Sequence, residues 1–175
     1  DIQVLAPMYK GEVGADNLNH RLREALNPKG KVVEYRDHSF RINDKVMQIK
    51  NNYDKEVFNG DIGRIENINI EDNILEVNFY DRKVKYDFSE LNELVLAYAI
   101  TVHKSQGSEY KIVIIPVMTQ HYLLLQRNLL YTGITRAREM VILVGTKKAL
   151  WIAIKNNKTF HRNTLLSERL KEMSK

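Results

Sequence analysis

The sequence contains no cysteine and only three prolines among its 175 residues. Without cysteine, disulfide bonds and thiolate metal sites are excluded, which fits a cytoplasmic setting. No apolar run approaches the roughly 18 residues of a membrane-spanning helix, so we expect no membrane partner. Residues 1–5 include neither an initiator methionine nor a basic segment, so we expect no signal peptide and a chain that continues a longer protein.

The composition is that of a soluble globular domain, with 43% hydrophobic and 28% charged residues. The length indicates one domain, or one domain with a small insertion. A net charge of +5 and a pI near 9.3 are compatible with a polyanionic partner such as nucleic acid. The ordinary alternative is a solvated surface with a slight excess of lysine.

Continuous apolar runs predict buried parallel strands that are covered on both faces. They occupy residues 2–7, 94–100, 112–116 and 140–145. The helical patterns between them predict an α/β sheet with flanking helices.

Three helices are expected between and after these strands. The first starts at an Asp16 cap and carries Leu18, Leu22 and Leu26 on one face. The others cover residues 122–130 and 147–155, the latter with Leu150, Trp151 and Ile154 on one face. Trp151 and the aliphatic runs are expected in the core, and a last amphipathic helix is possible through Leu165, Leu166, Leu170 and Met173.

Residues 40–88 have a different texture, with short alternating apolar segments between turn signals such as Asn59-Gly60. Short strands at about ten-residue spacing predict a small antiparallel barrel inserted into the α/β domain. Its basic side chains could touch DNA, although a solvated face is the better interpretation for each one alone. These residues are Lys45, Lys50, Lys55 and Arg64.

Residues 101–109 read Thr-Val-His-Lys-Ser-Gln-Gly-Ser-Glu and directly follow an apolar strand. Hydroxyl, imidazole and ammonium groups at the carboxyl end of a strand can contact an anion, because ligands of open α/β sheets bind there. The ordinary alternative is a polar loop that caps a helix, and composition alone leaves both open.

Residues 131–138 read Tyr-Thr-Gly-Ile-Thr-Arg-Ala-Arg and end just before another apolar strand. Arg136 and Arg138 cannot share a helix face, since positions i and i+2 diverge. One guanidinium can therefore enter a site, and near a triphosphate it would stabilise the charge that develops in phosphoryl transfer. An isolated Arg-x-Arg is more often a pair of surface ion-pairing residues.

In this order, and each tied to an apolar strand, the two segments resemble motifs V and VI of superfamily 1 helicases. Residues 100–107 resemble the RecD/TraA branch, superfamily 1B, more than the UvrD/Rep branch. Residues 2–19 resemble the motif IV region, and residues 40–88 are similar to the SH3-like 2B insertion of RecD-type enzymes. The resemblance implies a RecA-like domain of the P-loop-NTPase type (2A), made of residues 1–39 and 89–175, with the insertion at 40–88.

The resemblance also implies roles for individual residues toward ATP and its Mg²⁺. Arg136 would be the arginine finger that reaches the γ-phosphate. Glu109 would accept a hydrogen bond from the ribose, and Gly107 would allow close backbone approach. Lys10 would supply a second cation, although the family often has Arg there and Lys cannot make the same bidentate contact. Arg138 is a further candidate, as a structural or DNA-contacting residue.

Thr101 and His103 would contact the backbone of single-stranded DNA by resemblance, with Lys104 and Ser105 as further candidates. The implied protein is an ATP-dependent DNA helicase that moves 5′→3′. Its other partners would be an N-terminal RecA-like domain of the same polypeptide and, in some relatives of this type, the subunits of a recombination nuclease.

What these 175 residues lack bears on the mechanism. They contain no Gly-x-x-x-x-Gly-Lys-Ser/Thr loop to cradle phosphates and no strand that ends in a Mg²⁺-binding Asp-Glu pair. We therefore expect this chain alone neither to bind ATP tightly nor to hydrolyse it.

Two other functions stay open at this point. The chain could be a non-catalytic nucleic-acid-binding module in which the barrel does the binding, or a regulatory module derived from a helicase. Tyr9, Tyr53 and Tyr80 could stack on bases, although packing is commoner for such residues. The spacing of His20, His38, His121 and His161 does not suggest a metal site.

Overall fold

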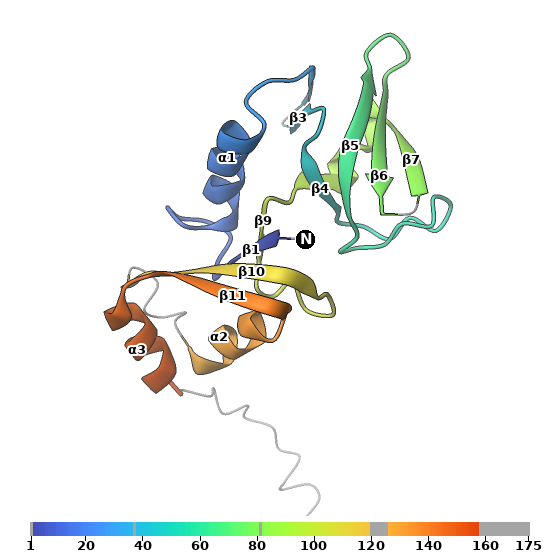
Figure 1. The fold of residues 1–175 in the computed structure, drawn as a ribbon. Helices are drawn as coiled ribbons and strands as arrows, with labels where there is room; N and C mark the ends of the chain where they lie inside the picture. Colours follow the sequence, from blue (N-terminus) through green and yellow to red (C-terminus); the bar gives the residue numbers. More distant parts are fainter. Residues whose placement is uncertain (1, 37, 81, 120–125, 158–175) are drawn as a thin grey trace, which may run out of the picture.

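The computed structural model describes residues 2–36, 38–80, 82–119 and 126–157, which form two sheets and a hairpin (Figure 1). The first sheet is parallel, in the order β11-β10-β1-β9. Its strands are β1 (Ile2–Ala6), β9 (Ala99–Thr101), β10 (Tyr110–Val117) and β11 (Ala137–Gly145). The parallel α/β sheet predicted from the apolar runs is confirmed.

Helices flank this sheet on both sides: α1 (Ala15–Leu26), α2 (Arg127–Ile134) and α3 (Lys147–Lys155). Figure 1 shows α2 and α3 together on one side of the sheet and α1 on the other. The helix expected over residues 122–130 begins at Arg127 and runs to Ile134. Residues 122–125 of that prediction, and the helix expected through Leu165 to Met173, lie outside the described residues.

The second sheet is antiparallel, in the order β7-β6-β5-β4-β8, and the hairpin β2–β3 packs against it without strand pairing among the described residues. Its core gathers alternate apolar side chains such as Ile65, Leu75, Val77 and Leu91. The antiparallel strands are confirmed, but the sheet is open, because no pairing joins β7 to β8 among the described residues. The elements are β2 (Val32–Tyr35), β3 (His38–Arg41), β4 (Lys45–Gln48), β5 (Ile62–Asn69), β6 (Ile74–Phe79), β7 (Arg82–Asp87), the 3₁₀ helix η1 (Phe88–Glu93) and β8 (Leu94–Leu96).

The apolar run over residues 94–100 does not form one parallel strand as expected. Leu94–Leu96 pairs antiparallel with β4, whereas Ala99–Thr101 pairs parallel with β1. Between them the chain passes from one sheet to the other, and Gln3 of β1 donates to the carbonyls of Ala97 at 3.1 Å and Tyr98 at 3.3 Å. The side-chain amide of Gln3 therefore fixes the point where the chain passes between the sheets, and the apolar pattern does not reveal it.

The N-terminus of α1 differs from the expectation that Asp16 caps it. The N-cap residue is Gly14, and Asp16 lies inside the first turn. A Cβ atom at Gly14 would lie 2.5 Å from backbone atoms of Lys10 and Tyr9, so a side chain does not fit there. Because the backbone of the preceding turn lies so close, only glycine fits at this position, and a residue with a capping side chain does not.

The fully buried face of α1 is not the face that carries the three leucines. The helix buries Ala15, Asn19 and Arg23, while Leu18 and Leu22 are half-buried and Leu26 is 69% exposed. Asn19 exchanges two hydrogen bonds of 2.8 Å with the backbone of Ala99 in β9. The polar face is buried because it supplies partners to polar groups where the two sheets meet.

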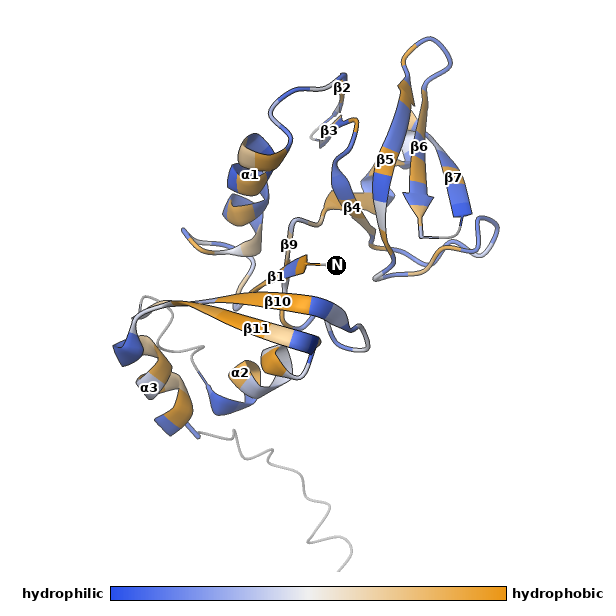
Figure 2. Ribbon diagram, viewed as in Figure 1, coloured by the Kyte–Doolittle hydropathy of each residue, from blue (hydrophilic) through white to orange (hydrophobic). Residues whose placement is uncertain are grey.

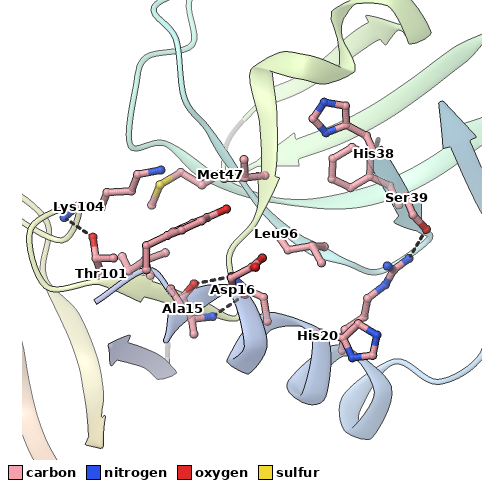
Figure 3. A pocket seen from close by; sticks show the side chains of 16 residues that line it. Ala15, Asp16, His20, His38, Ser39, Met47, Leu96, Thr101 and Lys104 are labelled. Carbon is pink, nitrogen blue, oxygen red and sulfur yellow. Dashed lines mark hydrogen bonds between the residues drawn. The ribbon is translucent and has the colours of Figure 1, made fainter. Parts of the chain in front are cut away.

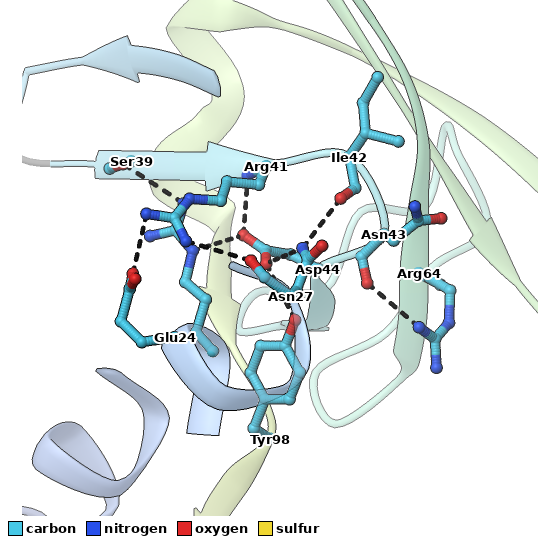
Figure 4. A network of polar contacts seen from close by, with 10 residues as sticks. Glu24, Asn27, Ser39, Arg41, Ile42, Asn43, Asp44, Arg64 and Tyr98 are labelled. Atoms are coloured by element: carbon cyan, nitrogen blue, oxygen red, sulfur yellow. Dashed lines mark hydrogen bonds and ion pairs between the residues drawn. The ribbon is translucent and has the colours of Figure 1, made fainter. Parts of the chain in front are cut away.

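A single carboxylate organises this junction (Figure 4). Asp44 is fully buried and accepts hydrogen bonds from Asn27 Nδ2 at 2.8 Å, Tyr98 OH at 2.9 Å and the Arg41 backbone N–H at 2.7 Å. Arg23 Nε lies 3.1 Å from its second oxygen. The network connects α1, the hairpin and the crossing between the sheets.

The expectation that every parallel strand is covered on both faces is wrong for β11. Met140 and Val144 are each 53% exposed, and the colouring in Figure 2 shows that hydrophobic residues make up most of β10 and β11. β11 is the edge of the sheet, with β10 as its only partner among the described strands. Trp151, which was expected in the core, is 58% exposed because α3 buries Ala149 and Ala153 instead.

Candidate functional site

The turn after β9 holds the first group of predicted site residues. The Val102 N–H donates to the carbonyl of Ala6 at 3.0 Å, which fixes the turn to the carboxyl end of β1. Thr101 Oγ1 accepts the backbone N–H of Lys104 at 3.3 Å. The side chains of His103 and Lys104 are exposed, so both can meet a ligand.

Ser105 differs from its neighbours in this turn. Its side chain is fully buried, and its hydroxyl donates to the carbonyl of Val102 at 2.7 Å. The hydroxyl therefore stabilises the turn from within. In this conformation the Ser105 side chain has no exposed surface with which to contact DNA.

Gly107 follows with a backbone φ of +87°, in the left-handed region that favours glycine. No atom lies within 4 Å of the position that a Cβ would take. The glycine is therefore explained by its backbone conformation, and the space beside it is open to an approaching group.

Arg136 lies between the end of α2 and the start of β11, and it connects the two sequence motifs. Its guanidinium donates to the carbonyls of Ser108 and Thr132, each at 3.3 Å, and to Thr135 Oγ1 at 3.3 Å. Its own carbonyl accepts the N–H of Tyr110 at 2.8 Å. The side chain is half-buried, and these neutral acceptors orient it without neutralising its charge.

Glu109 and Arg138 form an ion pair, with Arg138 Nε 2.8 Å from Glu109 Oε2. The two side chains are 56% and 70% exposed, so solvent reaches both partners. Two candidate site residues from different motifs, 29 positions apart, are therefore in direct contact.

The structure places the predicted site residues at two opposite edges of the parallel sheet. Lys10 and Thr101 follow the carboxyl ends of β1 and β9, whereas Glu109 and Arg136 precede the amino ends of β10 and β11. Because all four strands are parallel, these are opposite edges. Lys10, expected to act beside Arg136, is exposed and lies at the edge of the Thr101 turn.

Lys45, a possible DNA contact, faces the junction between the sheets. Its ammonium donates to Gln3 Oε1 at 2.7 Å and to the carbonyl of Ile2 at 3.0 Å. Burial, and secondarily the positive charge of Arg64, lowers the pKa of Lys45 to about 8. This lysine has a structural role in holding β4 against β1.

Two other basic residues of the second sheet are also engaged within the chain. Lys55 pairs with Glu90 and lies 4.6 Å from the centre of the Tyr86 ring. Arg64 donates to the carbonyl of Asn43 at 3.2 Å. Neither side chain is held toward a separate ligand.

The three tyrosines considered for base stacking are exposed, at 55% for Tyr9, 74% for Tyr53 and 102% for Tyr80, although the Tyr53 ring also packs edge-on against Phe58. Within the described ranges, no group of three or more histidine or acidic side chains could hold a metal ion. No helix in the same part of the chain is long and apolar enough to cross a membrane.

Sequence reasoning missed the polar residues at the junction, namely Gln3, Asn19, Arg23 and Asp44. The spacing of Asn19, Arg23 and Asn27 at every fourth position was a signal for a buried polar face on α1. The leucines at the same spacing outweighed it, because apolar periodicity is normally the stronger indicator.

Comparison with known proteins first defines the class. Residues 18–79 match the family model described as the ATP-dependent RecD-like DNA helicase SH3 domain, and residues 96–144 match the UvrD-like helicase C-terminal domain. Among solved structures, a Bacteroides Pif1 helicase in complex with ADP-AlF3 and single-stranded DNA is similar over 98% of this chain and 46% of its own, with a TM-score of 0.61 and 18% identity. Pif1 helicase from Candida albicans is similar over 99% of this chain and 50% of its own, with a TM-score of 0.59 and 15% identity. The fold is that of a RecA-like helicase domain.

Curated relatives define the branch. The ATP-dependent RecD2 DNA helicase of Deinococcus radiodurans is 39% identical over 170 residues, which cover 97% of this chain and 23% of that protein. The RecBCD enzyme subunit RecD of Haemophilus influenzae is 27% identical over 173 residues, 99% of this chain and 26% of that protein. The chain belongs to the RecD-type helicases and corresponds to part of their C-terminal region, and it spans about a quarter of the length of these relatives.

Proposed function

We propose that this chain is the part of an ATP-dependent DNA helicase that supplies the arginine finger, Arg136, and part of the single-stranded DNA track. One observation carries the proposal: the Arg136 guanidinium contacts the carbonyl of Ser108, so the end of the first motif lies beside the second motif at one sheet edge. Glu109 and Arg138 lie at the same edge, and Gly107 lies in the segment that leads there from His103 and Lys104, with which it lines a cavity.

The nucleotide is held mainly by an N-terminal RecA-like domain of the same polypeptide, which supplies the phosphate-binding loop and the Mg²⁺ ligands. When bound, Mg²⁺ would neutralise part of the phosphate charge, and the triphosphate contains the bond that is cleaved. Arg136 contributes a permanent positive charge, which stabilises the negative charge that develops on the transferred phosphoryl group. Glu109 accepts a hydrogen bond from the ribose, and Arg138 orients its carboxylate.

The opposite edge contacts the DNA. Thr101 and His103 donate hydrogen bonds to phosphate oxygens, Lys104 adds a positive charge, and Lys10 lies at the same edge. Movement of the two RecA-like domains relative to each other would step this edge along the strand in the 5′→3′ direction. In a relative that belongs to a recombination nuclease, the nuclease subunits would be further partners.

The deciding experiment replaces Arg136 with Ala in the full-length protein. We expect DNA-stimulated ATP hydrolysis to fall by about a thousandfold or more, because an arginine finger is worth roughly 10³–10⁵ in kcat. Binding of single-stranded DNA should not change, since Arg136 lies at the other edge. Arg21→Ala, at an exposed arginine of α1, serves as the control and should leave both properties intact. Unchanged hydrolysis in the Arg136 variant would favour a regulatory module.

A second experiment tests the chain by itself. Without a phosphate-binding loop, it should show no ATP turnover with or without single-stranded DNA, and robust turnover would contradict the proposal. A non-catalytic module remains the alternative. Removal of residues 40–88 would abolish DNA binding if the inserted strands were the binding part, and would spare much of it if the Thr101 turn is the track.

A further inference from the structure

A cavity of about 330 Å³ opens between α1, the hairpin and the two sheets (Figure 3). This volume lies at the lower end of the range for small-ligand sites, about 300–1,000 Å³. Thr101 and Lys104 lie at one end of the cavity and His20 and His38 at the other. The cavity therefore begins at the edge that we assign to the DNA backbone.

The wall formed by the sheets is apolar. It consists of Met47 from β4, Leu96 from β8 and Ala99 and Ile100 from β9. Leu96 is half-buried and offers accessible surface, whereas Met47, Ala99 and Ile100 are at most 3% exposed and support the wall from the core behind it. A fixed apolar surface of this kind suits the face of an aromatic ring.

The opposite side of the cavity carries polar groups from α1 and β3. Asp16, His20 and His38 line it, and their side chains make no hydrogen bond or ion pair within the described ranges. A carboxylate and two imidazoles can accept from ring N–H and exocyclic amino groups or donate to ring nitrogens and carbonyls. These are the groups that lie along the edges of a nucleobase.

The mouth of the cavity combines a cation with an aromatic ring. Lys104 is exposed there, and the ring of Tyr9 is 55% exposed. Proteins that hold single strands combine positive charge for the backbone with aromatic side chains on which bases stack. Charge at the mouth and flat apolar surface within are therefore complementary to a phosphate outside and a base inside.

The junction described above keeps this cavity open. Arg23 lines it and is held by the buried Asp44 at 3.1 Å, and its Nη2 also reaches Ser39 Oγ at 3.4 Å. Because these side chains are engaged with each other, they do not fold into the space.

We propose that this cavity binds one nucleobase of the single strand whose phosphates are held by Thr101 and Lys104. The inference rests on the proposed DNA track and adds a base-binding site to it. The base packs against Val95 and Leu96, and its polar edge faces Asp16 and the two histidines.

The test compares the binding of two short strands to this chain by fluorescence anisotropy. One is a mixed-sequence oligodeoxynucleotide, and the other has the same length and backbone but abasic sugars throughout. His20→Trp fills the cavity from an exposed position of α1. Ala25→Trp adds the same bulk to the same helix at an exposed residue outside the cavity. Circular dichroism of each variant verifies the fold.

The unmodified chain should bind the base-containing strand roughly fivefold more tightly or better, as expected for one stacked base. His20→Trp should remove most of this preference and leave the affinity for the abasic strand unchanged, whereas Ala25→Trp should change neither. Equal affinity of the unmodified chain for both strands, or a preference that survives in His20→Trp, would overturn the base site while leaving the track in place. Absence of binding to either strand would overturn the track itself and the base site with it.

Discussion

The Arg138 guanidinium and the Glu109 carboxylate form an ion pair of 2.8 Å that links the two helicase motifs across β10 and β11. Both side chains are more than half exposed, and exposed pairs contribute only about 0–1 kcal/mol to stability. The contact therefore matters more for the direction of the Glu109 carboxylate than for the fold.

Replacing Arg138 with Ala should raise the KM for ATP of the full-length protein by about two- to tenfold, with a smaller change in kcat. The reason is that Glu109 loses the partner that, in the proposed site, holds its carboxylate toward the ribose. Lys111→Ala is the matched control, because Lys111 pairs with Glu139 at 3.7 Å between the same two strands. Equal effects of the two variants on KM would contradict the positioning role.

Lys104→Ala should weaken the binding of single-stranded DNA to a similar degree for every sequence, because in the proposed track Lys104 contacts phosphate rather than base. The slope of log affinity against log salt should become shallower by about 0.7, the value for one phosphate contact on a single strand. Titrations at several salt concentrations measure the slope. Lys29→Ala, at an exposed lysine outside the turn, should leave it unchanged, and an unaltered slope in the Lys104 variant would remove Lys104 from the track.

Asp44→Ala should lower the free energy of unfolding by about 3–5 kcal/mol, since Arg23 would keep a buried charge without its partner. Asp44→Asn retains one oxygen acceptor and should cost less. Urea denaturation measures both. Glu24→Ala provides the contrast, because the Glu24–Arg41 pair is partly exposed and should contribute about 0–1 kcal/mol. Similar losses for Asp44→Ala and Glu24→Ala would show that the junction is not held by Asp44.

The stability of the chain should rise with pH between about 8 and 9.5 through Lys45. In the folded chain its pKa is lowered to about 8, below the ordinary value of 10.5, so in this window the unfolded chain binds more protons. The cost of burying the charge is fully present below pH 8 and is relieved as the pH rises. The expected gain is on the order of 1–2 kcal/mol. Urea denaturation of Lys45→Met should show a flatter pH dependence, and an equal slope in both proteins would contradict this assignment.

At higher pH, the raised pKa values of buried tyrosines make the stability of the chain fall with pH, whereas Lys45 makes it rise. Burial, reinforced by the negative charge of Asp44, raises the pKa of Tyr98 to about 12. Between about pH 10 and 12 the unfolded chain therefore loses this proton first, and stability falls as the pH rises. Measurements for Lys45 are best made below pH 10 for this reason.

The residues that carry the family were readable from the sequence because their order along the chain is itself the signal. Thr101 to Glu109 and Tyr131 to Arg138 each adjoin an apolar strand, and this linear pattern needs no tertiary information. The α/β class followed from the apolar runs for the same reason. The roles of Arg136 and its neighbours remain predictions that the experiments above address.

The orientation of α1 could not be read in the same way. Two stripes with a spacing of four residues compete on this helix, the leucines and the set of Asn19, Arg23 and Asn27. Only the positions of Asp44 and Ala99, distant in the chain, decide which stripe is buried. The exposure of Trp151 and of the β11 edge likewise depends on what covers them rather than on their own hydrophobicity.

The sequence by itself determined the class of the sheet, the presence of an inserted antiparallel unit and the helicase motifs, because periodicity and motif order are properties of the linear chain. Tertiary structure alone decided that the apolar run of residues 94–100 serves two sheets, that the predicted site residues divide between two opposite edges, and that Glu109 meets Arg138. These outcomes depend on strand pairing and on buried polar contacts between residues far apart in the chain, and local pattern carries no information about either.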